Sequence, residues 1–416
     1  MDTGTTAFML SCIIALTLMI PGLALFYGGM VSVKSSLNMM MMTFSAAALV
    51  GVLWVLFGFS MVFGTSYGGL IGNVTEFAGL RDLAEAMTTV DGLPVSLFAL
   101  FQALFAAITV ALVSGAAADR MKFSAWMVFA GVWAVLVYFP AAHWVFAFDG
   151  VVTENSVGGW IANKLGALDF AGGTAVHINA GAAALAVAIV LGKSVWFGSR
   201  KPHNVPLTLL GAGLLWAGWY AFNGGSALAA GTSASIVMVT TFVCTCSAVL
   251  AWLAVEKIKT GHVTGVGAAS GAITGLVAIT PACGSVTPVG AIFVGLISGA
   301  ICVYAVGLKE RFGYDDSLDV VGVHLVGGLV GTLLIGFFAS ETMPGGVNGL
   351  LYGGGIDQLW RQAVAAGAVM IYSFVVAYLI ALAIKKTMGI RISPEEEEQG
   401  IDAKFHGDWA YELQSA

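Results

Sequence analysis

Long runs of apolar residues, separated by short polar segments, follow one another along almost the whole chain. Each run has about the 20 residues that an α-helix needs to cross the hydrocarbon core of a bilayer. The pattern predicts an all-α polytopic membrane protein with eleven transmembrane helices. Their expected ranges are 8–29, 38–64, 94–118, 123–147, 170–192, 206–228, 234–256, 264–281, 288–306, 318–340 and 361–386.

The basic residues are distributed unevenly over the predicted loops. Of the 17 Lys and Arg residues, only Arg81, Lys164 and Arg361 fall on one side. The other side holds Lys34, Arg120, Lys122, Lys193, Arg200, Lys201, Lys257, Lys259, Lys309, Arg311, Lys385, Lys386, Arg391 and Lys404. Since cytoplasmic loops carry the excess of basic residues, we expect an external N-terminus and a cytoplasmic C-terminus. The expected location is the cell (plasma or inner) membrane.

A spacing of eight residues between an aspartate and a histidine occurs twice in the chain. Asp169 lies just before and His177 on the fifth predicted helix, and Asp316 lies just before and His324 on the tenth. Each repeat has five helices, and because five is an odd number, the second repeat starts on the opposite side of the membrane from the first. The second repeat is therefore inverted relative to the first. We therefore predict a 5+5 inverted repeat, with the eleventh helix as an addition at the C-terminus.

Each of these histidines is followed four residues later by a glycine, Gly181 or Gly328. This spacing places the glycine one turn away on the same helix face. Since glycine has no side chain, a neighbouring helix or a permeating molecule can come close at these positions.

Ionisable side chains at bilayer depth are costly, so His177 and His324 are candidates for function. A single histidine is more often a satisfied core residue, but two at repeat-related positions favour a shared functional site. Apolar surroundings disfavour the charged form. We therefore expect two neutral imidazoles, each with one donor and one acceptor.

Two further features have both a structural and a functional interpretation. Asp169 immediately precedes a helix, where it can cap the free N–H groups, but it also lies where it would favour a cation. Phe101 and Phe105, one turn apart, are typical of core packing. They become functional if they face the same axis as Phe222 and the histidines, because dehydrating cations are attracted to aromatic faces.

Composition narrows the classes of function. The chain is 58% hydrophobic and only 10% charged, which effectively excludes a soluble enzyme. The net charge of −6 comes with no basic stripe, so no nucleic-acid partner is expected. The five cysteines show no metal or disulfide spacing and are interpreted as small core residues. We predict neither a metal nor a cofactor.

Several strings of residues resemble the ammonium transporter (Amt/Mep/Rh) family, of the Amt type. They are Pro21–Gly29, Phe101–Phe105, Asp119–Ser124, Leu168–Asn179, Trp219–Ser226, Thr280–Gly284, Asp315–His324 and Gly389–Tyr411. The resemblance extends over nearly the whole chain. It implies a homotrimer in the lipid bilayer, with one pore in each subunit.

By position, the resemblance implies that Phe101, Phe146 and Ser226 line an external ammonium site, with Asp169 supporting it. The family usually has tryptophan where this chain has Phe146. Phenylalanine is the weaker cation–π partner and lacks the N–H group, so recruitment of the cation is expected to be weaker. Trp144, two residues earlier on the helix, should face elsewhere.

The resemblance also implies that Phe105 and Phe222 form a stacked aromatic gate and that His177 and His324 form a twin-histidine pair. The expected function is that of an ammonium transporter and not of an enzyme. It captures ammonium, deprotonates it and conducts ammonia through an apolar pore, where the histidine pair could relay the proton.

Two alternatives belong to other classes of protein. A membrane haem protein would use His177 and His324 as axial ligands, although no other feature of the sequence indicates a porphyrin-binding site. An ammonium sensor that hardly transports would normally carry a signalling domain, and the residues after Lys386 are too few for one.

The predicted transmembrane domain spans residues 1–386, and residues 387–416 form a hydrophilic cytoplasmic tail. On composition alone, the acidic run Glu395–Glu398 is typical of a solvated segment. The resemblance instead indicates a regulatory tail, with a PII-type signalling protein as the expected partner.

Overall fold

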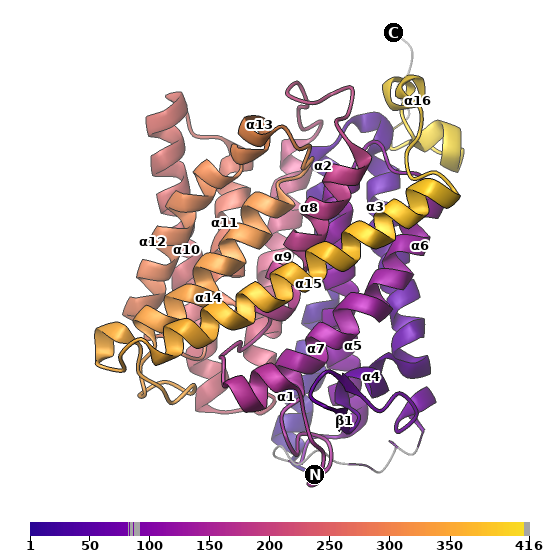
Figure 1. Ribbon diagram of the computed structural model, residues 1–416. Helices are drawn as coiled ribbons and strands as arrows, with labels where there is room; N and C mark the ends of the chain where they lie inside the picture. Colours follow the sequence, from indigo (N-terminus) through magenta and orange to yellow (C-terminus); the bar gives the residue numbers. More distant parts are fainter. Residues whose placement is uncertain (82, 84–85, 87–91, 412–416) are drawn as a thin grey trace.

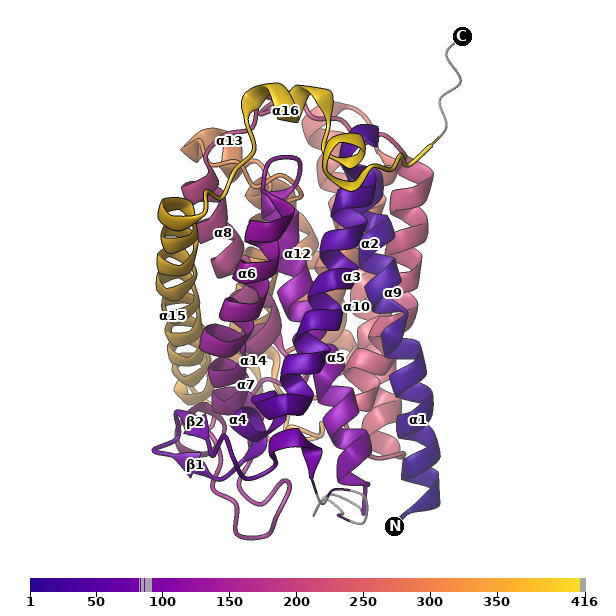
Figure 2. The ribbon, with the colours of Figure 1, turned by 90° about the vertical axis from the view of Figure 1, so that its right-hand side faces the viewer.

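The computed structural model describes residues 1–81, 83, 86 and 92–411, which form a bundle of long helices (Figure 1, Figure 2). In this part of the chain, ten helical segments are long and apolar enough to cross a membrane. They are Thr3–Met30, Val33–Phe63, Val95–Ala117, Phe123–Phe146, Gly173–Leu191, Val205–Gly225, Thr232–Thr260, Pro288–Phe312, Val321–Phe338 and Asp357–Thr387. The shorter apolar helix α11 (Gly265–Ile279) completes the predicted set of eleven. The predicted fold class is confirmed.

The bounds of the individual elements follow. The α-helices are α1 (Thr3–Thr17), α2 (Met19–Met30), α3 (Ser36–Leu53), α4 (Phe59–Phe63), α5 (Val95–Val113), α6 (Phe123–Trp133), α7 (Phe139–Phe146), α8 (Asn179–Leu191), α9 (Val205–Gly225), α10 (Thr232–Thr260), α12 (Pro288–Ala305), α13 (Leu308–Phe312), α14 (Val326–Phe338), α15 (Asp357–Thr387) and α16 (Pro394–Gln399). Wider π-helical turns are η2 (Trp54–Gly58), η5 (Ala134–Tyr138), η6 (Ile161–Leu165), η7 (Gly173–Ile178), η8 (Val321–Leu325) and η10 (Asp402–His406). Tighter turns are η1 (Val33–Ser35), η3 (Ala78–Leu80), η4 (Ser114–Ala117) and η9 (Leu350–Tyr352). The strands β1 (Ser66–Tyr67) and β2 (Ile71–Gly72) form a small antiparallel hairpin.

Prolines and capping residues set several of these boundaries. Pro21 has no N–H group to donate to the carbonyl of Thr17, and its ring would clash with that carbonyl. As a result α1 ends at Thr17 and α2 begins two residues later. In α9 and α12 the proline lies in the first turn, where the missing N–H costs nothing, and Asn204 and Thr287 cap the free N–H groups.

The two ends of the described chain lie on opposite faces of the bundle (Figure 1, Figure 2). We call the face that carries residues 388–411 the tail face and the opposite one the N-terminal face. The predicted separation of the termini is confirmed. Which of the two faces is cytoplasmic stays a prediction.

The two halves meet at their repeat-related histidines. A Cβ atom at Gly181 would lie 2.5 Å from the backbone nitrogen of Leu325, the residue after His324. Reciprocally, a Cβ atom at Gly328 would lie 3.2 Å from Cβ of His177. Each glycine therefore admits the histidine-bearing segment of the other half, as the spacing predicted.

The additional helix α15 runs obliquely along the outside of the bundle (Figure 1). Its Gln362 accepts a hydrogen bond from Leu168 N at 2.7 Å and donates one to Leu168 O at 2.7 Å. Ser373 donates to the carbonyl of Asn179 at 2.7 Å. These bonds tie α15 to the segment that begins before α8 and carries His177.

The tail, which contains α16 and η10, packs across the tail face (Figure 2). The carboxylate of Asp402 accepts hydrogen bonds from Leu37 N at 2.9 Å and Asn38 N at 2.8 Å, at the start of α3. Glu397 pairs with Arg391, and its side chain is fully buried. The interpretation of the acidic run as a solvated segment is therefore wrong for Glu397, because a basic partner and packing remove it from water. Residues 412–416 of the predicted tail lie outside the described residues.

Candidate functional site

A cavity of about 50 Å³ lies near the N-terminal face, with room for a few water-sized molecules. Its polar side chains are Gln102 and Ser226. The other lining residues are Phe98, Phe105, Phe146, Phe148, Val151, Phe170 and Leu228. The cavity therefore combines aromatic faces with two neutral polar groups.

Helix α5 presents Phe98, Gln102 and Phe105 to this cavity, at the spacing of four and three that defines one helix face. Phe101 lies on the flank of that face. It is fully buried, with its ring 4.9 Å from that of Phe105, and does not line the cavity. Its ring packs against Phe105 and Gly225, and its role in the external site stays a prediction.

Phe146, at the end of α7, does line the cavity, and its ring is perpendicular to that of Phe105 at 6.1 Å. Trp144 faces elsewhere, as its position two residues earlier predicted. Its indole Nε1 donates to the carbonyl of Leu70 at 2.8 Å, and its ring packs against Tyr372. Trp144 therefore cannot take the place of a tryptophan at position 146.

Asp169 acts as a cap for the segment that carries His177. Its Oδ1 accepts from the backbone N–H groups of Gly172 at 2.7 Å and Gly173 at 2.6 Å. Its Oδ2 accepts from Thr174 at 2.7 Å and Ala175 at 3.1 Å. These four bonds use the approximately four acceptor sites of a carboxylate. The structural interpretation of Asp169 is thus realised, and the residue does not line the cavity.

The rings of Phe105 and Phe222 stack with their centroids 4.0 Å apart and their planes at 13°. Both side chains are buried. Phe105 lines the cavity near the N-terminal face, whereas Phe222 lines a second cavity deeper in the bundle. The stacked pair therefore separates the two cavities, in the position that a gate would occupy.

The second cavity, of about 10 Å³, has room for one water-sized molecule. It is lined by Met19, Leu23, Phe26, Ile108, Leu112, His177, Leu215, Trp219, Phe222, Ile273 and His324. Nδ1 of His177 lies 3.2 Å from Nδ1 of His324, and both rings are buried. Nε2 of His177 is buried without a hydrogen-bond partner in the described part of the chain. The predicted histidine pair is brought together in an otherwise apolar cavity.

Trp219 and Gln102 are site residues that the sequence reasoning missed. The indole of Trp219 stacks against His177 at 5.4 Å and donates to Oγ1 of Thr280 at 2.8 Å. Its position three residues before Phe222, on the same helix face, could have indicated this placement. Gln102 is the one amide side chain within α5, which is otherwise almost entirely apolar.

The direct contact of His177 with His324 argues against the haem alternative. Two ring nitrogens at 3.2 Å share a hydrogen bond and leave no space for an iron and its porphyrin between them. Within the described residues, no group of three or more His, Cys, Asp or Glu side chains could hold a metal ion.

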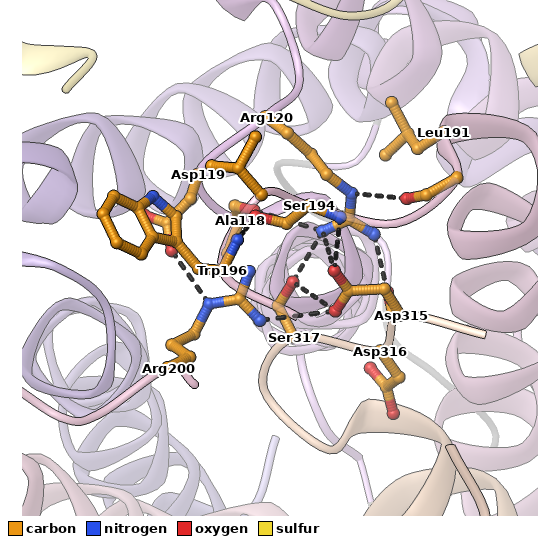
Figure 3. Close-up of polar contacts among 12 residues, drawn as sticks. Ala118, Asp119, Arg120, Leu191, Ser194, Trp196, Arg200, Asp315, Asp316 and Ser317 are labelled. Carbon is orange, nitrogen blue, oxygen red and sulfur yellow. Dashed lines mark hydrogen bonds and ion pairs between the residues drawn. The ribbon is translucent and has the colours of Figure 1, made fainter. Parts of the chain in front are cut away.

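A buried cluster of charges braces the tail face (Figure 3). The guanidinium of Arg120 donates to the carbonyl of Asp315 at 2.6 Å and to Oγ of Ser317 at 2.6 Å. Arg200 contacts the carboxylates of Asp315 at 3.3 Å and Asp119 at 3.1 Å. These contacts tie the loops before α6 and α9 to the segment that leads into η8 and His324.

The pKa values of two adjacent carboxyl groups in this region shift in opposite directions. Burial raises the pKa of Asp315, but the positive charges of Arg120 and Arg200 outweigh it and lower that pKa overall. Burial raises the pKa of Asp316 to about 7, and the nearby charge of Asp319 adds to the increase. Oδ2 of Asp316 accepts from Val321 N at 2.7 Å, whereas its Oδ1 has no partner among the described residues.

The stacked phenylalanines and the paired histidines thus lie in one column, at positions that the family resemblance predicted. The sequence profile of the Ammonium Transporter Family matches residues 7–411. The chain belongs to the ammonium transporter family. An ammonium transporter of Mycobacterium tuberculosis is 52% identical over 435 residues, which cover 99% of this chain and 91% of that relative. The protein is accordingly a multi-pass membrane transporter of ammonium.

Solved structures support the same fold. The crystal structure of Candida albicans Mep2 is 34% identical and covers 95% of this chain and 87% of its own, with a TM-score of 0.87. A structure titled as a sensor Amt protein is 29% identical and covers 96% of this transporter and 97% of its own chain, with a TM-score of 0.87. The backbone of the family is thus retained over nearly the whole chain.

Proposed function

We propose that this ammonium transporter captures ammonium in the cavity near the N-terminal face, removes its proton and conducts ammonia past the paired histidines. The aromatic faces and the oxygen of Ser226 suit a cation that is losing water. Phe101 and Asp169 support this site from behind, by packing and by capping. The phenylalanine pair of Phe105 and Phe222 is the gate through which the substrate passes.

Selection between ammonium and ammonia follows from the apolar path beyond the gate. The second cavity offers few polar atoms, so a cation that enters it loses its hydration without compensation. Neutral ammonia loses much less. Larger or permanently hydrated cations would be rejected by the same barrier, and so would ammonium that keeps its proton.

The single observation that carries the proposal is the contact between the two Nδ1 atoms of His177 and His324 at 3.2 Å. A hydrogen bond between two Nδ1 atoms needs one hydrogen, so one neutral ring is protonated at Nδ1 and the other at Nε2. The pair then presents one free Nε2 lone pair and one Nε2–H group. Nε2 of His177, which has no partner among the described residues, is the acceptor assigned to the gate side.

These tautomers allow a proton relay. The proton removed from ammonium binds to Nε2 of His177, and the shared hydrogen passes from its Nδ1 to Nδ1 of His324. His324 then releases its own Nε2 proton toward the tail face. One proton has entered and one has left, while ammonia crosses as a neutral molecule. The tautomers must reset before the next proton follows.

The test measures ammonium-induced current and uptake of isotopically labelled methylammonium in proteoliposomes. We expect His177→Ala and His324→Ala each to abolish the current, because the relay is broken, while neutral or leak flux persists. His262→Ala is the matched control, since this histidine is exposed on the tail face and should leave both signals unchanged. If both pore variants keep the wild-type current and selectivity, the histidines only line the pore. Wild-type protein without either signal would favour the sensor alternative.

We further propose that the tail face is cytoplasmic and that the protein forms a homotrimer in the plasma or inner membrane. The basic residues favour this orientation, and the family resemblance favours the trimer. On the same grounds, residues 387–416 are assigned a regulatory role, with a PII-type signalling protein as partner. Antibody access to either terminus in intact cells, and native mass measurement, test the orientation and the assembly.

A further inference from the structure

A buried histidine outside the two cavities joins three elements near the N-terminal face. His143 lies on α7, is fully buried, and uses both of its ring nitrogens. Its Nδ1 lies 2.6 Å from the carbonyl oxygen of Val62 in α4, and its Nε2 lies 2.7 Å from Oγ of Ser66 in β1. An imidazole inside an apolar helix bundle is costly, so a ring with two such bonds indicates a specific role.

The direction of the two hydrogen bonds follows from their partners. A carbonyl oxygen only accepts, so Nδ1 of His143 carries the hydrogen and donates to Val62. Nε2 of the neutral ring is then an acceptor, and the hydroxyl of Ser66 donates to it. Oγ of Ser66 accepts in turn from Gly69 N at 2.9 Å, in the turn of the hairpin. One neutral imidazole thus ties the hairpin of β1 and β2 to both α4 and α7 (Figure 1, Figure 2).

The same hairpin holds a loop that forms part of the cavity near the N-terminal face. This loop, residues 147–160, contributes Phe148 and Val151 to the cavity wall. Further along the loop, the carbonyl of Val157 accepts from Ser66 N at 2.9 Å. Ser66 therefore binds the histidine ring through its side chain and the loop through its backbone.

The loop also lies directly against the backbone of α7. A Cβ atom at Gly159 would lie 1.9 Å from the carbonyl oxygen of His143, and one at Gly158 would lie 1.9 Å from that of Ala147. Phe146 lies between these two carbonyls in the chain and lines the same cavity. A shift of the hairpin would therefore move the loop and the end of α7, and with them the wall of the cavity.

We propose that His143 is a positioning residue of the capture site, because its ring fixes the hairpin that holds the loop 147–160 and the end of α7 in place. The inference rests on the proposed function, since the cavity must capture ammonium for the position of its wall to matter. His143 itself does not line the cavity. Its loss would loosen the wall and weaken capture, while the phenylalanine gate and the histidine pair stay intact.

The test compares ammonium-induced currents from the full chain in proteoliposomes for the wild type, His143→Asn, Ser66→Ala and the double variant. The side-chain N–H of asparagine can replace Nδ1–H as the donor to Val62, so only the bond to Ser66 is lost. We expect His143→Asn to raise the half-saturating ammonium concentration about fivefold, the effect of one hydrogen bond, with a maximal current within about twofold of the wild type. The double variant should resemble Ser66→Ala, because both single changes remove the same bond.

Thr287→Ala is the matched control. Thr287 caps α12 by accepting from Gly290 N at 3.1 Å, and its hydroxyl lies 3.4 Å from that of Tyr352. Both partners lie outside the hairpin and the loop 147–160. We therefore expect this variant to lose a comparable hydrogen bond while its half-saturating concentration, measured per folded molecule, stays unchanged.

A half-saturating concentration of His143→Asn within about twofold of the wild type overturns the proposal, and so does an equal rise in Thr287→Ala. Effects of His143→Asn and Ser66→Ala that multiply in the double variant also overturn it, because the shared bond would then not carry the effect. If His143→Asn does not fold, as judged by gel filtration, the value of Ser66→Ala decides on the same criteria. A saturating wild-type current leaves the capture site in place in all these cases. A wild-type current that does not saturate overturns that site and the role of His143 with it.

Discussion

Asp169→Asn separates the structural role of this residue from a direct role in cation binding. The carboxylate accepts four backbone N–H groups at the start of η7. The amide has one oxygen, so two of the four N–H groups would face an NH₂ group that cannot accept. Hydrogen bonds to a charged group contribute about 1.5–3 kcal/mol each, so losing two costs about 3–6 kcal/mol. This is a large share of the roughly 5–15 kcal/mol that stabilises a typical domain.

The assay is thermal unfolding of the purified protein in detergent, combined with transport measured per amount of folded protein. We expect Asp169→Asn to lower the unfolding midpoint markedly and to reduce the yield of folded protein. The control is Asp357→Asn at the start of α15, because Asp357 is 60% exposed and its pair with Arg361 lies at the surface. Exposed pairs contribute about 0–1 kcal/mol, so the control should unfold close to the wild type.

One result would refute this reasoning. If Asp169→Asn unfolds at the wild-type temperature and its only defect is a raised half-saturating ammonium concentration, the carboxylate contacts the cation and the cap is dispensable. A variant that is unstable but transports normally per folded molecule would support the structural role alone.

Three further predictions concern the cavity, the tail face and the tail. Phe146→Trp should lower the half-saturating ammonium concentration about two- to fivefold, because indole is the stronger cation–π partner by about 0.5–1 kcal/mol; an unchanged or higher value would remove Phe146 from the site. Since burial raises the pKa of Asp316 to about 7, above the usual value of 3.8, its stabilising contribution is complete below pH about 4 and lost as the pH rises through 7. Asp316→Asn should therefore lose less thermal stability than the wild type between about pH 4 and 7, and superimposable pH profiles would contradict this. Truncation after Lys386 should alter ammonium uptake while the protein stays assembled, because it removes the bonds of Asp402 to α3; wild-type uptake and inhibition would leave the tail without a regulatory role.

The sequence predicted the number and approximate position of the membrane helices because the bilayer fixes how long an apolar run must be. The predicted helix boundaries were less accurate where a helix begins with polar residues. The first helix was expected from residue 8 but begins at Thr3, because Asp2 caps the first turn and accepts from Thr5 N at 2.5 Å. A polar stretch at a helix start carries no hydrophobic signal, although its N–H groups can be satisfied locally.

The histidine pair could be predicted from the matched spacing of Asp169 with His177 and of Asp316 with His324. Which residues line the cavity could not be predicted from the sequence. Whether Phe101 or Gln102 faces the cavity depends on a rotation of α5 by about one residue, or roughly 100°. The packing of α5 against α3, α1 and α8 fixes that rotation. Both positions lie in an apolar run without a strong preferred face, so periodicity alone cannot decide between them.

The inverted repeat produces matching histidines but anchors them differently. The turn that carries His177 is held by its own Asp169, which uses all of its acceptor sites locally. The equivalent Asp316 accepts from Val321 N, and its second oxygen has no partner among the described residues. The segment before His324 is instead held by Arg120, whose own carbonyl accepts from Ile392 of the tail at 3.1 Å. The tail therefore bonds through Arg120 to the segment that precedes His324, and its Arg391 also donates to the carbonyl of Leu191 at 3.1 Å, at the end of the helix that follows His177.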